Sequence, residues 1–133
     1  MSVQKKQQAY ARGVEAEQVA ARYLKARGYK ILEQRYKTPV GEVDLIAQKD
    51  GGLVFAEVKA HKNEEAALYA VTEQSRRRIE AAAGHYLSRH EDMATCGMRF
   101  DVLVVPPEAL KERLNLLGAV SVRHLDNAWV CGE

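Results

Sequence analysis

A strand–turn–strand pattern occupies residues 41–60, which read GEVDLIAQKDGGLVFAEVKA. Apolar residues run through both halves, and the Lys-Asp-Gly-Gly segment at 49–52 separates them. An Asp-Gly pair between two such runs is typical of a tight two-residue hairpin turn. We therefore predict two antiparallel strands, at about 42–48 and 53–60, joined by a turn at Asp50 and Gly51.

The register of this hairpin places acidic side chains on one face. With Asp50 and Gly51 in the turn, every cross-strand pair adds up to 101 in residue number, so that Asp44 lies opposite Glu57. Opposite residues and residues two apart share a face, so Lys59 projects beside them. Two carboxylates about 5 Å apart repel by roughly 3 kcal/mol at an effective dielectric constant near 20. A positive charge is needed to offset that repulsion.

A divalent cation would supply this charge. Mg²⁺ (or Mn²⁺) prefers oxygen ligands and is commonly held by one or two carboxylates together with waters and substrate phosphates. Such an ion activates water and polarises phosphoryl oxygens, and Lys59 could orient the water or stabilise the developing charge. The pattern thus predicts a metal site at Asp44 and Glu57 and hydrolysis of phosphodiesters. An Asp followed by Glu-x-Lys is also common on solvated sheet faces, and spacing alone leaves that interpretation open.

A helix is predicted from about residue 8 to residue 27, with Gly28 as its stop. Winding it at 100° per residue places Glu17 in the middle of the buried stripe and Glu15 on the solvated side. A carboxylate is rarely buried without a partner. Glu17 is therefore predicted to be a third acid of the site, holding the metal's waters or a second metal, although it could instead pair with an arginine. The stripe consists of Tyr10, Val14, Glu17, Ala21 and Leu24.

The rest of the chain predicts three more strands, at about 29–37, 98–105 and 120–125, and a second helix at about 71–89. The order αβββαββ indicates an α/β fold with a mixed β-sheet flanked by helices. We expect a single domain over residues 1–133, with residues 1–7 forming a disordered basic tail.

Positive charge is concentrated in the first third of the chain. The net charge is only +2, but residues 1–40 contain nine Lys or Arg against three acids. This bias suits a polyanionic partner, although a solvated helix face explains it about as often. No run approaches the ~18 apolar residues of a membrane span, and Cys96 and Cys131 match no metal-ligand spacing. We expect a soluble, cytoplasmic protein with no membrane partner.

Four side chains are candidates for contact with nucleic acid, namely Lys37, His61, Lys62 and Arg78. Arg78 ends the run of arginines at 76–78, near the start of the second helix. Its two neighbours have acids four positions away, so a salt-bridged helix surface explains them at least as well. Two other polar residues are interpreted as structural: Asp101 as a hydrogen-bonding residue at a strand end, and Trp129 as a packing anchor.

Several of these motifs resemble a known family. The runs GEVDLIA at 41–47 and VFAEVK at 54–59 are similar to the signature of the bacterial YraN-like proteins, a largely uncharacterised group in the restriction-endonuclease-like superfamily. Further similarities span nearly the whole chain: Gly13-x-x-x-Glu17-x-x-Ala20, Tyr23-Leu24, Gly28-Tyr29, Arg99-Phe100-Asp101 and Asn127-Ala128.

This resemblance implies a restriction-endonuclease-like fold. It also implies a catalytic set of Glu17, Asp44, Glu57 and Lys59, the four residues that the helical stripe and hairpin register select. Resemblance to archaeal Holliday-junction resolvases, which share the fold, implies branched DNA as the substrate and a homodimer.

The sequence departs from the family at two places that would face substrate. The family usually continues Glu-Val-Lys with Thr or Ser and then Arg, whereas this chain has Ala60-His61-Lys62. Ser75 stands where a lysine usually precedes the arginine run. Two hypotheses follow: a metal-dependent endonuclease acting on DNA, and a nucleic-acid-binding module that keeps the nuclease fold without cutting.

Overall fold

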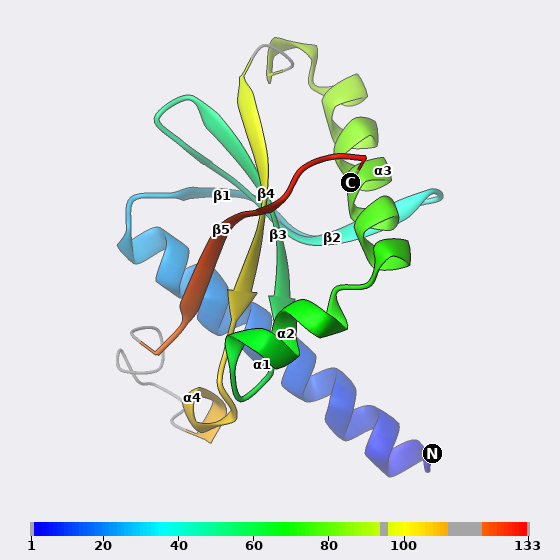
Figure 1. The fold of residues 1–133 in the computed structure, drawn as a ribbon, viewed down its shortest axis with the longest axis vertical. Helices are drawn as coiled ribbons and strands as arrows, with labels where there is room; N and C mark the ends of the chain where they lie inside the picture. The colour runs from blue at the N-terminus through cyan, green and yellow to red at the C-terminus, as the bar shows by residue number, and fades with distance from the viewer. Residues whose placement is uncertain (1, 94–95, 112–120, 133) are drawn as a thin grey trace.

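A five-stranded mixed sheet forms the centre of the computed structural model, which describes residues 2–93, 96–111 and 121–132 (Figure 1). The strands lie in the order β1-β2-β3-β4-β5, and all neighbours are antiparallel except β3 and β4, which run parallel. The strands are β1 (Lys30–Thr38), β2 (Gly41–Lys49), β3 (Gly52–Lys59), β4 (Gly97–Val104) and β5 (Arg123–Trp129). The helices are α1 (Val3–Ala26), α2 (Glu64–Ala70), α3 (Glu73–Arg89) and α4 (Pro107–Lys111), with a 3-10 turn η1 (Glu91–Met93). The expected mixed sheet flanked by helices is confirmed.

The hairpin of β2 and β3 has the predicted register. Asp50 and Gly51 both have positive φ, 51° and 78°, as a two-residue turn matching the twist of the strands requires. Lys49 consequently pairs with Gly52, and the ladder continues to the pair of Leu45 with Ala56.

Apolar side chains cover both faces of the sheet. On one face Leu45, Ala47 and Val54 pack with the buried stripe of α1. On the other, Ile46 and Phe55 pack with the inner side of α3. Successive residues of a strand point to opposite faces, so a sheet buried on both faces requires the nearly continuous apolar runs seen in the sequence.

Helix α1 starts earlier than predicted. The Ser2 side chain accepts a hydrogen bond from the Lys5 backbone N–H and caps a helix that begins at Val3. The prediction of a disordered tail over residues 1–7 is therefore wrong for residues 3–7, which are helical. The helix ends as predicted before Gly28, where the Tyr29 N–H donates to the Leu24 carbonyl.

Three elements differ from the sequence prediction. Helices α2 and α4 were not predicted because they are only seven and five residues long. The last strand lies at Arg123–Trp129 rather than at 120–125, and residue 120 is outside the described residues. Strand β5 lies at the edge of the sheet, so its mostly polar residues need no apolar run.

Candidate active site

Strands β2 and β3 separate at Asp44. In a continued ladder the Val58 N–H would donate to the Val43 carbonyl. Instead it donates to Asp44 Oδ2 at 2.8 Å. The alternation of side chains along β2 is also interrupted here. Residues two apart in a strand normally share a face, but Val43 packs on the α3 side and Leu45 on the α1 side. The hairpin thus opens at its far end, and a backbone hydrogen bond fixes the Asp44 carboxylate in the opening.

A cleft of about 270 Å³ lies beside this opening, with α3 as its second wall. Gly41 sets how closely that wall approaches, because a Cβ at this position would lie 2.0 Å from the Arg78 carbonyl oxygen. Only glycine permits the start of β2 to pass so near the backbone of α3. The cleft is lined by Glu42, Asp44, Glu57, Val58 and Lys59 from the sheet and by Ser75, Arg78 and Ile79 from α3.

Glu57 and Lys59 lie together on the β3 side of the cleft. The Lys59 Nζ atom is 3.6 Å from Glu57 Oε2. Burial raises the pKa of Glu57 far above its ordinary value, and hydrogen bonding to Asp44 and the charge of Asp44 raise it further. The Lys59 ammonium lowers this pKa but does not compensate. The raised pKa favours the protonated form of the Glu57 carboxyl group at neutral pH.

Glu17 reaches the same carboxylate from α1. It is 8% exposed, and its pKa is raised to about 7 by burial first and then by the charge of Asp44. Arg35 and Lys37 act in the opposite direction, and Arg35 Nε lies 3.5 Å from Glu17 Oε2. The sequence left open whether Glu17 joins the other acids or pairs with an arginine. In the structure Glu17 does both, since it interacts with Asp44 and with Arg35. Asp44 is the acid next to both glutamates.

Arg35 is the site residue that the sequence did not reveal. It has a φ of 54°, which is unusual for a residue other than glycine. The pairing of β1 with β2 also shifts register between Ile31 and Glu33. The Arg35 guanidinium donates to the Tyr10 hydroxyl at 2.9 Å while facing Glu17. No local sequence signal marks this position, because the bulge and the positive φ arise from tertiary packing.

The carboxylates fit a Mg²⁺ site only as a pair. Within the part of the chain that the structure describes, no group of three or more His, Cys, Asp or Glu side chains is arranged to hold a metal ion. Asp44 and Glu57 nevertheless line the same cleft within hydrogen-bonding reach of each other, and two carboxylates are a usual protein ligand set for Mg²⁺. A cation there would take over the role of the proton. The metal assignment of Asp44, Glu57 and Glu17 remains a prediction.

The four candidates for contact with nucleic acid lie in different places. Arg78 is exposed and lines the cleft, as does Ser75. Lys37 is exposed on β1 and near enough to Glu17 to lower its pKa. His61 follows the end of β3, whereas Lys62 lines a separate hollow with Arg123. Of the four, Arg78 is the one that borders the acidic cleft.

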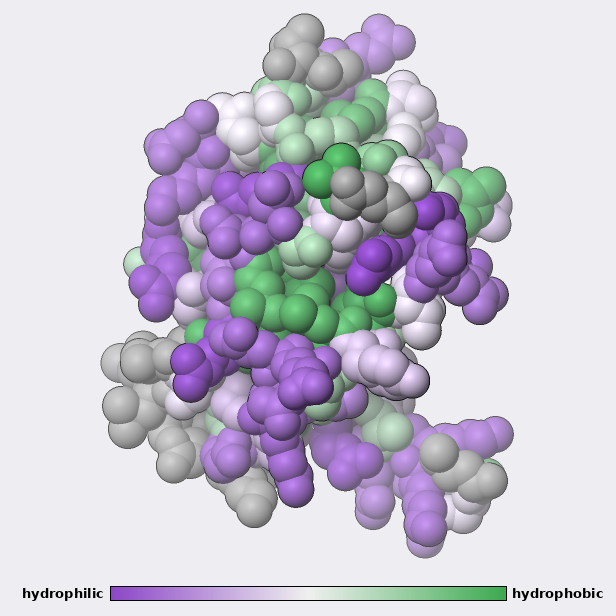
Figure 2. Space-filling model, in the orientation of Figure 1, coloured by the Kyte–Doolittle hydropathy of each residue, from purple (hydrophilic) through white to green (hydrophobic). Residues whose placement is uncertain are grey.

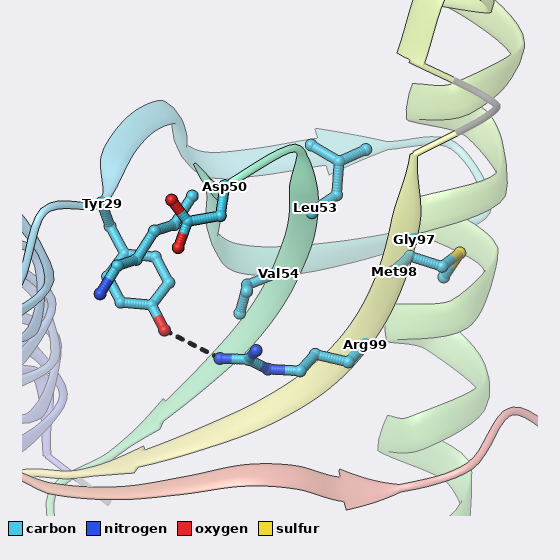
Figure 3. Close-up of a pocket in the computed structure, with 9 residues that line it drawn as sticks. Tyr29, Asp50, Leu53, Val54, Gly97, Met98 and Arg99 are labelled. Carbon is cyan, nitrogen blue, oxygen red and sulfur yellow. Dashed lines mark hydrogen bonds between the residues drawn. The ribbon is translucent and has the colours of Figure 1, made fainter.

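A larger hollow, of about 460 Å³, lies at the opposite end of the hairpin (Figure 3). Its main polar groups are already satisfied by the protein. Arg99 donates to the Tyr29 hydroxyl at 2.9 Å and also to Asp101 at 2.9 Å. Asp101 is fully buried and receives further hydrogen bonds, as expected of a structural strand residue. We therefore place the chemistry in the smaller cleft, where acidic charge is not balanced.

The sequence was compared with known proteins. Residues 16–105 match the model of the uncharacterised protein family UPF0102. The chain belongs to this family. It is 45% identical over 106 residues to the UPF0102 protein RPA0323 of Rhodopseudomonas palustris, covering 80% of this chain and 82% of the relative. It is 46% identical over 104 residues to a UPF0102 protein of Brucella canis, covering 78% of this chain and 82% of the relative. All four predicted catalytic residues of this UPF0102 protein lie inside the matched region.

Among the described residues of this UPF0102 protein, no helix combines the length and apolar character that crossing a bilayer requires.

Proposed function

We propose that this UPF0102 protein is a metal-dependent endonuclease that hydrolyses phosphodiester bonds of DNA, with branched DNA as a preferred substrate. One observation carries the proposal: Asp44 and Glu57 crowd against each other beside Lys59, in a cleft whose other wall carries Arg78. Crowded acids at the mouth of a cleft are typical of functional sites. A lysine and an arginine on the two walls would favour a phosphate group between them.

In this arrangement Asp44 and Glu57 would hold Mg²⁺ or Mn²⁺, which supplies a water of lowered pKa and balances charge on the phosphate. The hydrogen bond from the Val58 N–H keeps the Asp44 carboxylate in place for this. Lys59 orients the attacking water or stabilises the negative charge that grows on the phosphoryl oxygens. Glu17 accepts a proton near neutral pH, since its pKa is about 7.

The remaining groups position the DNA. Arg78 on α3 would contact phosphate at the cleft and Lys37 on β1 would contact phosphate near Glu17, while His61 and Lys62 would contact the backbone beyond the end of β3. A homodimer would present two such clefts, which suits a four-way junction with two strands to cut. Both the preference for branched DNA and the dimer come from fold-level analogy.

A second candidate function is a nucleic-acid-binding module without catalysis. It is favoured by the absence, within the described residues, of a group of three acids arranged for metal binding. Ser75 also favours it: its hydroxyl donates to the Thr72 carbonyl, so the family's usual lysine is replaced in the cleft by an uncharged side chain that is bonded to the first turn of α3.

A cleavage assay separates the two functions. Labelled linear, flapped and four-way DNA are incubated with 5 mM Mn²⁺ or Mg²⁺ and the native protein, Lys59→Ala or Lys49→Ala. We expect Lys59→Ala to lose on the order of 10²- to 10³-fold in cleavage rate, as when a group that stabilises the transition state is removed. Lys49→Ala removes the same charge at the other end of the hairpin and should cleave like the native protein. Binding without cleavage under every condition would establish the module instead.

A further inference from the structure

The first three turns of α1, residues 3–13, stand clear of the body of the protein (Figure 1). Every residue of this segment is exposed, in contrast to the buried stripe that begins at Ala16. In the space-filling view the segment projects as a mostly hydrophilic extension (Figure 2). We call residues 3–13 the arm. At 1.5 Å per residue the arm extends about 16 Å.

The arm carries positive charge only. It contains Lys5, Lys6 and Arg12, and no acid occurs before Glu15. Lys5 and Arg12 are seven residues apart and thus lie on one side of the helix, while Lys6 lies on another. A surface with three cations and no internal acid is complementary to a polyanion.

One side of the arm leads to Glu17, which interacts with Asp44 of the acidic cleft. Lys6, Tyr10, Gly13 and Glu17 are separated by four, three and four residues, so they follow one side of α1. Lys6 and Glu17 are thus about 16 Å apart along the axis, roughly the length of five base pairs of DNA. A strand lying on this side would reach Glu17, one of the predicted catalytic residues.

Two observations point to an external ligand on this side. Gly13 costs about 1 kcal/mol relative to alanine in a helix, yet a Cβ there would meet no atom of this protein within 4 Å. Tyr10 is 61% exposed, and its ring and hydroxyl are held by Arg35, which also faces Glu17. The arm is therefore connected to Glu17 through Arg35, and the surface at Gly13 is open to a ligand.

We infer that the arm is a DNA-binding element that holds the phosphate backbone of the substrate on its path into the cleft. This inference rests on the proposed function for the nature of the ligand, and adds to it a surface outside the family match, which begins at residue 16. Lys5, Lys6 and Arg12 contact phosphates, which are the same in every DNA sequence. The arm therefore raises the affinity for DNA of any sequence.

Binding of a labelled 24-base-pair duplex and a labelled four-way junction, measured by fluorescence anisotropy in EDTA at 50–200 mM NaCl, tests the arm. The arm variant carries Lys5→Ala, Lys6→Ala and Arg12→Ala. The matched control carries Arg22→Ala, Lys25→Ala and Lys30→Ala, which removes the same charge from exposed positions beyond Glu17. We expect the arm variant to bind on the order of 10- to 100-fold more weakly at 50 mM salt, with a salt dependence shallower by about two to three ions.

The outcomes separate the arm from the proposed function. Equal losses of DNA affinity in the arm variant and the control would show that affinity depends on net charge alone. That result would contradict the role of the arm but not the proposed nuclease activity. No DNA binding by the native protein would overturn both. Loss of binding to vesicles of 30% phosphatidylglycerol, with DNA binding unchanged, would show that the arm contacts lipid. Conversion of a dimer to a monomer in the arm variant, measured by light scattering, would make the arm a contact between protein copies.

Discussion

The buried Asp101 and the acids of the cleft region lie in surroundings that act on negative charge in opposite directions. Asp101 accepts hydrogen bonds from Arg99 Nε at 2.9 Å, from His124 Nε2 at 2.6 Å and from the Asn127 N–H at 2.9 Å. Burial alone would raise the pKa of Asp101, but these donors outweigh burial and hold it below the ordinary value. In the cleft, burial and the neighbouring Asp44 raise the pKa of Glu17 and that of Glu57.

This difference separates an acid that stabilises the fold from the acids that the proposed function would use. Asp101 is surrounded by the partners that an ionised carboxylate needs, so its charge stabilises the junction of α1, β4 and β5. The acids of the cleft receive too few donors from the protein, and their charge destabilises the fold until something else binds. The predictions that follow test this contrast in decreasing order of effect.

The largest effect is expected for Asp101→Asn. Replacing the fully buried carboxylate leaves the partly exposed Arg99 guanidinium without its counter-charge. Removal of one partner of a buried ion pair costs about 3–5 kcal/mol, and the 35% exposure of the Arg99 side chain places the expected cost at the lower end of that range. Urea denaturation at pH 7 would measure the free energy of unfolding. Asp126→Asn, at an exposed position of the neighbouring strand β5, is the matched control and should change stability by less than about 0.5 kcal/mol. Similarly small changes in the free energy of unfolding for Asp101→Asn and Asp126→Asn would show that the Asp101 carboxylate does not stabilise the fold.

The next effect is a dependence of stability on pH. In EDTA, we expect stability to decrease as pH rises from 4.5 to about 7, since Glu17 binds its proton more tightly in the folded state than in the unfolded chain. Glu17→Gln should flatten this decrease by on the order of 1–3 kcal/mol. Denaturation midpoints between pH 4 and pH 8 would show it.

Asp101 should give the opposite slope. Its lowered folded pKa means that its stabilising contribution is present above the unfolded value of 3.8 and is lost as pH falls below it. Asp101→Asn should therefore leave the slope between pH 4.5 and pH 7 unchanged. A native protein whose stability is flat over that window would contradict the raised pKa of Glu17.

The sequence was sufficient to predict those parts of the site that depend on local geometry. The Asp-Gly turn fixed which residues of β2 and β3 face each other, and helical periodicity placed Glu17 on the buried side of α1. Arg35 could not be predicted, because its position depends on a register shift and a positive φ in β1. The role of Gly41 was also hidden, since its need for close approach to α3 involves residues almost 40 positions apart.

The third prediction concerns divalent cations. We expect 10 mM Mg²⁺ or Mn²⁺ to raise the melting temperature of the native protein by about 3–6 °C, as for a ligand present at ten times its dissociation constant, which stabilises by about 1.4 kcal/mol. The increase should disappear in Asp44→Asn and persist in Asp126→Asn. Thermal denaturation with Ca²⁺ or added NaCl as a control measures any general salt effect. Equal increases in all variants would eliminate the proposed metal pair.

The smallest effect is expected for Asp44→Asn itself, measured without metal. The amide oxygen of asparagine can still accept the Val58 N–H, so the strand opening keeps its hydrogen bond. The substitution also removes the charge that raises the pKa of Glu17 and that of Glu57. These effects should leave stability unchanged or raise it by up to about 1 kcal/mol. The same exchange of Asp for Asn would then cost several kcal/mol at position 101 and nothing at position 44. A loss at position 44 as large as at 101 would mean that the cleft acids, like Asp101, serve the fold.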